Sequence, residues 1–164
     1  MTEPDTDFRR DPVGTALRGT NPTVLRRLPG SFAAFGFSQF LPGYCVLLTD
    51  RPGIGALADL DRTERMAFLT SMDLLATAIE TACRAVVGNF RRMNLEILGN
   101  TDEFLHAHLW PRYHWEPAEY QPGPVWFYPP DRWSAPEQLP GPEHDRVREA
   151  ICTELDRLTD LDPR

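Results

Sequence analysis

Residues 91–113 read RRMNLEILGNTDEFLHAHLWPRY, and this stretch decides the fold. In its first part apolar and polar residues alternate, with Met93, Leu95 and Ile97 on one face, as in a half-buried strand. The residues GNTDE at 99–103 have turn chemistry, and a second apolar run follows them. The pattern therefore predicts a hairpin of two antiparallel strands.

Two of the four histidines lie on the second predicted strand, at alternate positions. Because successive side chains of a strand point to opposite faces, His106 and His108 share a face with Phe104 and Trp110. Their Cα atoms are then roughly 6.6 Å apart, at about 3.3 Å per residue, which is close enough to hold one ligand. The apolar side chains between them are expected to pack against a helix.

Three interpretations of this histidine pair remain open from the residues alone. The two imidazoles can be exposed or structurally hydrogen-bonded side chains. They can bind zinc, which needs a third ligand such as Glu103, His114 or His144, although no spacing fixes one. Finally, one imidazole can act as a nucleophile while the other hydrogen-bonds to the substrate.

The preceding sequence predicts a further hairpin and a long helix. The runs SFAAFGF (31–37) and GYCVLLTD (43–50) are apolar and β-prone, and SQFLPG supplies a turn between them. Asp61 followed by Glu64 has the form of a helix N-terminal cap. Apolar residues then recur at spacings of three and four until Gly88, which predicts a helix of about 25 residues.

The overall composition limits the classes of function. The chain has 164 residues and a formal net charge of −7, which argues against broad binding to nucleic-acid polymers or anionic membranes. All 17 basic residues are arginines, so a lysine Schiff base and a Walker-type phosphate loop are excluded. The three cysteines are widely spaced in apolar surroundings, which indicates buried thiols. No segment has the pattern of a signal peptide or a membrane span, so we expect a soluble cytoplasmic protein.

The sequence LHAHLWPRY resembles the signature of the histidine triad superfamily of nucleotide hydrolases and transferases. That signature is His-φ-His-φ-His followed by two apolar residues and often by Pro-Arg, where φ is an apolar residue. Counted back from Pro111 and Arg112, His108 aligns with the last histidine and His106 with the middle one, the nucleophile of the family. Phe104 stands where the first histidine would be.

The resemblance extends to the first predicted hairpin and covers roughly residues 30–113. SFAAFGFSQFLPGYCVLL is similar to the family's first hairpin, with Tyr44 in place of the histidine of its Pro-Gly-His turn. Gly36 stands where many relatives carry a polar ribose contact, and Ser38 or Gln39 are the substitutes. Together with the periodicity, the resemblance implies an α+β fold with an antiparallel sheet of about five strands, one long helix and a C-terminal helix.

Three segments of the chain are expected. Residues 1–22 are polar and broken by proline and glycine, which predicts a flexible arm before the histidine-triad-like core at 23–113. Residues 114–164 contain a segment rich in proline and aromatics and then a helix that begins at Pro142. We expect them to wrap the same domain, and the alternatives are that the aromatic segment closes a pocket or forms a subunit interface.

The activity that the resemblance implies is hydrolysis at the α-phosphate of a nucleoside phosphate derivative. His106 would attack phosphorus to give a nucleotidyl-histidine, and His108 would donate to a phosphate or leaving-group oxygen. The first expected substrates are dinucleoside polyphosphates such as diadenosine tetraphosphate. The alternatives are nucleotidyl transfer or phosphorolysis, and nucleotide binding without catalysis. The resemblance implies no cofactor or metal, and the homodimer common in the family is one expected state.

Besides Ser38 and Gln39, six residues near the histidines are candidates for substrate binding. They are Asn100, Asn94, Arg92, Arg112, Tyr44 and Trp110. Asn100 can instead be a turn former, and Arg92 a solvated strand charge. Arg112 is favoured as an ion-pairing residue, Trp110 as a core aromatic and Tyr44 as a packed turn aromatic.

Overall fold

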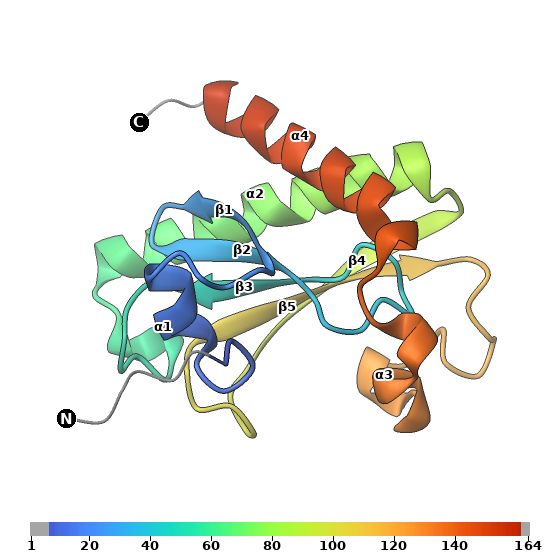
Figure 1. The fold of residues 1–164 in the computed structure, drawn as a ribbon, viewed down its shortest axis with the longest axis horizontal. Coiled ribbons are helices and arrows are strands. Elements are labelled where there is room, and N and C mark those ends of the chain that lie inside the picture. Colours follow the sequence, from blue (N-terminus) through green and yellow to red (C-terminus); the bar gives the residue numbers. More distant parts are fainter. Residues whose placement is uncertain (1–6, 162–164) are drawn as a thin grey trace.

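A computed structural model describes residues 7–161, and these form a five-stranded antiparallel sheet with helices on both faces (Figure 1). The strands are β1 (Val24–Leu28), β2 (Ser31–Phe35), β3 (Cys45–Thr49), β4 (Phe90–Leu98) and β5 (His106–Tyr113). Their order in the sheet is β1-β2-β3-β5-β4. The predicted α+β fold with about five antiparallel strands is therefore confirmed.

Two long helices, α2 and α4, cover one face of this sheet, and the short helix α1 lies on the other (Figure 1). The α-helices are α1 (Pro12–Leu17), α2 (Arg62–Val86), α3 (Asp131–Ser134) and α4 (Asp145–Leu161). Short 3₁₀ turns are η1 (Leu57–Asp59), η2 (Val125–Phe127), η3 (Pro136–Gln138) and η4 (Pro142–His144). The predicted C-terminal helix is confirmed, preceded by a 3₁₀ turn that begins at Pro142.

The boundaries of α2 follow from local chemistry. The Asp61 carboxylate accepts from the Glu64 backbone N–H at 2.9 Å, and the Glu64 side chain accepts from the Asp61 N–H at 3.2 Å. At the other end Gly88 has φ +79, and its N–H donates to the Cys83 carbonyl at 2.9 Å. The predicted capped helix of about 25 residues is confirmed.

The apolar stripe of α2 packs in the interior. Among residues 7–161, α2 alone is long and apolar enough to cross a bilayer by length and composition. Its side chains at Phe68, Leu75 and Ile79 are fully buried in the main hydrophobic cluster, against the sheet and α4. The helix therefore serves as the core helix of this domain.

Strand β5 lies between β3 and β4, and its register gives the histidines their face. His106 is paired with Leu48 and His108 with Val46, while Leu105 and Leu109 point to the opposite face and are buried in the main core. The predicted sharing of one face by the two histidines is thus confirmed. The strand runs further than predicted, through Pro111 to Tyr113, since its pairing with β3 ends at Leu109 and a proline is tolerated where a strand has one neighbour.

The described part of the predicted flexible arm contains helix α1. The Asp11 carboxylate accepts from the Gly14 N–H at 2.9 Å and caps α1. Ala16 is buried against Phe32 and Leu48 on the histidine face of the sheet. Residues 1–6 of the predicted arm lie outside the described residues.

Candidate active site

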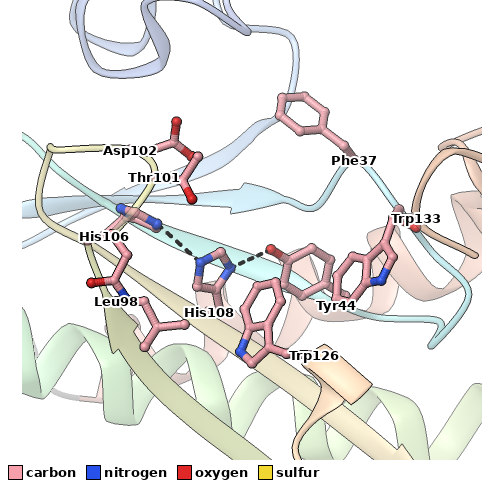
Figure 2. Close-up of a pocket in the computed structure, with 12 residues that line it drawn as sticks. Phe37, Tyr44, Leu98, Thr101, Asp102, His106, His108, Trp126 and Trp133 are labelled. Atoms are coloured by element: carbon pink, nitrogen blue, oxygen red, sulfur yellow. Dashed lines mark hydrogen bonds between the residues drawn. The ribbon is translucent and has the colours of Figure 1, made fainter. Parts of the chain in front are cut away.

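A pocket of about 470 Å³ lies on the histidine face of the sheet (Figure 2). Its walls come from β5, from the loop between β2 and β3, from the turn before β5 and from the segment between β5 and α4. The lining residues are Phe37, Ser38, Tyr44, Leu98, Gly99, Asn100, Thr101, Asp102, His106, His108, Trp126 and Trp133. The structure thus brings five of the predicted site residues together with two tryptophans of the aromatic segment: Ser38, Tyr44, Asn100, His106 and His108.

The protonation of His106 is fixed by a backbone carbonyl. Its Nδ1 lies 2.7 Å from the carbonyl oxygen of Phe104, and the residue is 4% exposed. Because a carbonyl only accepts, Nδ1 carries the hydrogen, and a neutral imidazole then has its lone pair on Nε2. The Phe104 ring also packs on this imidazole, with ring centroids 4.7 Å apart. Phe104 therefore orients His106 through both its backbone carbonyl and its ring.

His108 links His106 to Tyr44 (Figure 2). Its Nε2 is 3.1 Å from His106 Nε2, and its Nδ1 is 2.7 Å from the Tyr44 hydroxyl. With both imidazoles neutral and the His106 lone pair on Nε2, His108 must donate from Nε2 and accept at Nδ1. The hydroxyl of Tyr44 then donates to Nδ1. The three hydrogen bonds, from Tyr44 to His108, from His108 to His106 and from His106 to Phe104, are thus all donated in the direction of the Phe104 carbonyl.

The environment of His108 disfavours its charged form. Burial, and secondly the charge that His106 can carry, lower the pKa of His108 from 6.5 to about 4. At neutral pH this imidazole is therefore uncharged and can serve as a hydrogen-bond donor through Nε2.

Acid is expected to destabilise the protein in part through His108. Between pH 6.5 and about 4 the unfolded chain binds a proton there that the folded chain does not. This contribution to stability is fully present above pH 6.5 and is lost as the pH falls toward 4. In a series of urea-unfolding measurements across this range, His108→Gln should lose less stability than the wild type. An identical acid loss in both proteins would contradict the lowered pKa.

Two tryptophans from the segment between β5 and α4 close the pocket beside His108. Trp126 lies edge-on to the His108 ring, with centroids 5.1 Å apart, and stacks on Trp133 at 5.0 Å. The indole N–H of Trp126 donates to Glu96 at 2.7 Å, which ties it to β4. The aromatic segment thus contributes part of the pocket wall and is attached to the sheet through Glu96.

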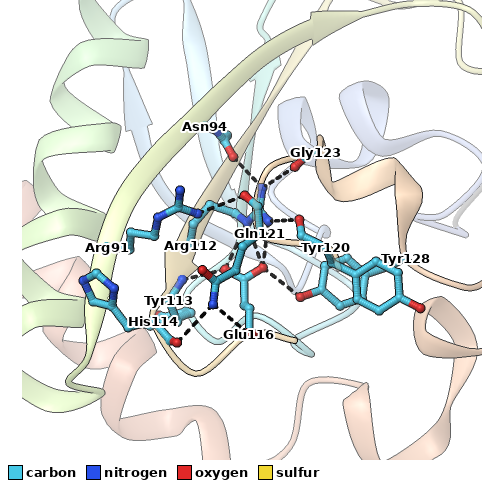
Figure 3. Close-up of polar contacts among 10 residues, drawn as sticks. All are labelled: Arg91, Asn94, Arg112, Tyr113, His114, Glu116, Tyr120, Gln121, Gly123 and Tyr128. Carbon is cyan, nitrogen blue, oxygen red and sulfur yellow. Dashed lines mark hydrogen bonds and ion pairs between the residues drawn. The ribbon is translucent and has the colours of Figure 1, made fainter. Parts of the chain in front are cut away.

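Arg112 and Asn94, which were candidates for substrate binding, do not line the histidine pocket, and their side chains bond to each other (Figure 3). Arg112 is 2% exposed, and its guanidinium pairs with the buried carboxylate of Glu116 at 2.8 Å. It also donates to Asn94 Oδ1 and to the carbonyls of Tyr120 and Gly123, at 2.8 to 2.9 Å. The predicted alternative, an ion pair that holds the chain after β5, is confirmed.

Three further candidates also do not line the histidine pocket. Trp110 is fully buried and stacks on Tyr44 with ring centroids 3.4 Å apart, so its alternative as a core aromatic is correct. Gln39 is 1% exposed; its amide donates to the Gly36 and Tyr44 carbonyls and braces the loop. Arg92 is exposed on β4 outside the pocket, in agreement with a solvated strand charge.

Several residues of the pocket were not predicted. Asp102, Thr101 and Gly99 lie in the turn before β5, which the sequence identified only as a turn. Phe37 follows β2 and lies beside Phe8, with ring centroids 5.6 Å apart. A smaller pocket of about 120 Å³ adjoins the histidines, and Arg9 from the N-terminal segment is among its lining residues. Only the aromatic richness of the segment after β5 was a usable signal.

The described residues supply no third zinc ligand beside His106 and His108. Within residues 7–161 no three histidine, cysteine, aspartate or glutamate side chains lie close enough together to hold one ion. Two of the proposed third ligands, Glu103 and His114, are exposed and do not line the histidine pocket.

Comparisons with known proteins place this geometry in a known fold. The sequence matches no protein-family model and shows no significant match to a curated protein. A histidine triad protein from Sinorhizobium meliloti superposes with a TM-score of 0.65 at 19% identity, over 94% of this chain and 95% of that one. One from Bradyrhizobium japonicum gives 0.61 at 22% identity, over 82% and 87%. The chain has the histidine triad fold.

A third solved structure with this histidine triad fold is a hypothetical histidine triad nucleotide-binding protein from Sulfolobus tokodaii. It superposes with a TM-score of 0.62 at 14% identity, over 90% of this chain and 92% of that one. Identities this low establish the shared fold, while the chemistry of the site has to be argued from the residues of this chain.

Proposed function

We propose that the protein is a cytoplasmic nucleotide hydrolase that acts at the α-phosphate of a nucleoside phosphate derivative, with His106 as the nucleophile. The observation that carries this proposal is the hydrogen bond from His106 Nδ1 to the Phe104 carbonyl. It leaves the lone pair on Nε2, the nitrogen directed toward His108 in the pocket. A neutral imidazole held in this way can attack an electrophile without a separate base.

The first step forms a bond between His106 Nε2 and the α-phosphorus. The bond from phosphorus to the leaving group breaks, and its electron pair departs with that group. As the substrate enters, a phosphate oxygen replaces His106 as the acceptor of the His108 Nε2–H. Ser38 and Asn100, which line the same pocket, are further donors for the phosphate oxygens.

The second step releases the nucleotide. A water oxygen bonds to phosphorus, the N–P bond breaks, and its electron pair returns to Nε2 of His106. The proton of the water passes to solvent. His106 is then neutral again, with its Nδ1–H still on the Phe104 carbonyl, and is ready for another turnover.

Support for a nucleotide as substrate comes from the fold and from the description of the Sulfolobus tokodaii protein as nucleotide-binding. Dinucleoside polyphosphates remain the first substrates to test. The 470 Å³ pocket, with aromatic walls at Phe37, Trp126 and Trp133, offers surfaces on which a nucleobase can stack.

The decisive experiment is a search for a covalent intermediate. The protein is mixed briefly with diadenosine tetraphosphate, quenched at neutral pH and analysed by mass spectrometry of its peptides. An adenylyl group on the His106 peptide, absent in His106→Ala, is the expected result. Turnover without any adduct, or an adduct on another residue, would refute His106 as nucleophile, and tight binding without turnover would indicate a nucleotide-binding protein.

A further inference from the structure

Tyr44 is confined by its neighbours, and its hydroxyl lies 2.7 Å from His108 Nδ1. Its ring stacks on Trp110 with an interplanar angle of 3°, and the residue is 7% exposed. On another side lies Gly36, where an added Cβ would be 2.0 Å from Tyr44 Cδ1 and 2.3 Å from Cε1. Gly36 and Tyr44 therefore depend on each other sterically, because a side chain at position 36 would clash with the Tyr44 ring.

This confinement decides what His108 can do with its proton. If neutral His108 gave its Nε2 proton to a leaving group, Nδ1 would have to gain one at the same time to avoid an imidazolate. The group on Nδ1 is the Tyr44 hydroxyl, at 2.7 Å. Burial raises the pKa of Tyr44 far above its usual range, so the phenol keeps its proton.

Charged His108 is not an alternative proton donor. Burial and the neighbouring His106 lower the pKa of His108 to about 4, so the imidazolium is scarce at neutral pH. His108 can donate a hydrogen bond from Nε2–H to the substrate, but it cannot transfer that proton to a leaving group.

We propose that Tyr44 is a positioning residue that locks His108 as a hydrogen-bond donor, and that the site therefore accepts substrates whose leaving group departs as a stable anion. This inference rests on the proposed function. His108 donates to a non-bridging phosphate oxygen, and the leaving oxygen departs with its electron pair and takes no proton from the chain. Phosphoanhydrides and aryl phosphodiesters of nucleosides meet this demand, whereas phosphoramidates of alkylamines do not.

The leaving-group restriction can be measured directly. Adenosine 5′-phosphate aryl esters of graded phenol acidity are compared with diadenosine tetraphosphate and with an alkylamine phosphoramidate of AMP. We expect kcat/KM to fall steadily as the phenol becomes less acidic, and the amidate to react about 10³-fold more slowly than the anhydride, within the range that a general acid supplies. Equal rates for the amidate and the anhydride would overturn the restriction.

The lock itself has a readout that needs no turnover. In ¹⁵N NMR of the wild type, His108 should be the Nε2–H tautomer. Tyr44→Phe keeps the ring stacked on Trp110 but removes the hydroxyl, so only the hydrogen bond to His106 Nε2 still favours the Nε2–H form of His108. The share of the Nδ1–H tautomer should therefore rise, and kcat should fall about tenfold at unchanged KM. Gly36→Ala should displace the ring and give the same spectrum, and the double variant should match either single one.

A matched control and two contrary outcomes complete the test. Tyr120→Phe alters a tyrosine outside both histidine pockets and should leave the spectrum and kcat unchanged. If Tyr44→Phe leaves His108 entirely Nε2–H, the lock is refuted, whatever the activity. If the lock is seen but no compound reacts, the proposed function fails, and the leaving-group restriction fails with it.

Discussion

Replacing His106 with alanine is expected to lower kcat for diadenosine tetraphosphate by about 10⁴-fold or more. The variant has no imidazole at the attacking position, while the pocket walls from the other segments of the chain stay in place. Hydrolysis is measured at saturating substrate, so that a change in binding is not mistaken for a change in chemistry. Activity within tenfold of the wild type would exclude His106 as the nucleophile.

The matched control for this experiment is His114→Ala. His114 is exposed and lies beside the Arg112 network (Figure 3), and it does not line the histidine pocket. Its removal should leave kcat unchanged. Since His106 is buried, urea unfolding of His106→Ala is needed as well, to show that the loss of activity occurs in a folded protein.

Replacing Glu116 with glutamine is expected to lower the free energy of unfolding by about 3 to 5 kcal/mol. Glu116 is 3% exposed, and its carboxylate is the charge partner of the buried Arg112 guanidinium. It also accepts from the Tyr128 hydroxyl at 2.7 Å and from the Tyr113 backbone N–H. The neutral amide would leave a buried positive charge without compensation.

Urea unfolding of Glu116→Gln and of Glu119→Gln measures this effect against an exposed carboxylate of the same segment. The second variant should change stability by less than about 0.5 kcal/mol. The double variant Arg112→Met, Glu116→Leu removes both charges and should recover part of the stability, because the Tyr113 N–H and the Tyr128 hydroxyl lose their acceptor. A loss below about 1 kcal/mol in Glu116→Gln would show that Arg112 is compensated by its carbonyl and amide acceptors alone.

The parts of the fold that the sequence predicted are those with local signals. Alternation defined β4, spacings of three and four defined α2, and the capping residues set its start. Strand β1 has no such signal: it is a five-residue edge strand with two adjacent arginines, and Arg26 is held by Asp156 of α4 at 2.6 Å. Helix α1 is six residues long and depends on its contact with the sheet, which sequence periodicity does not show.

The part of the site that could be predicted is the part that follows from the alternation of side chains along a strand, called parity here. Parity correctly placed His106 and His108 on one face and also put Trp110 there. It could not show that the segment after β5 folds back over that face, which buries Trp110 and brings Trp126 and Trp133 to the pocket. The positions of such distant segments depend on long-range contacts like the hydrogen bond from the Trp126 indole to Glu96, which no sequence spacing encodes.

The contact between Gly36 and the Tyr44 ring also makes these two positions dependent on each other in evolution. With tyrosine at 44, the Cβ of any side chain gained at 36 meets the ring, so the ring has to move. Because the Tyr44 hydroxyl is bonded to His108 Nδ1, this movement changes the surroundings of the histidine pair. Selection at position 36 therefore acts on His108 as well as on the loop that carries Gly36.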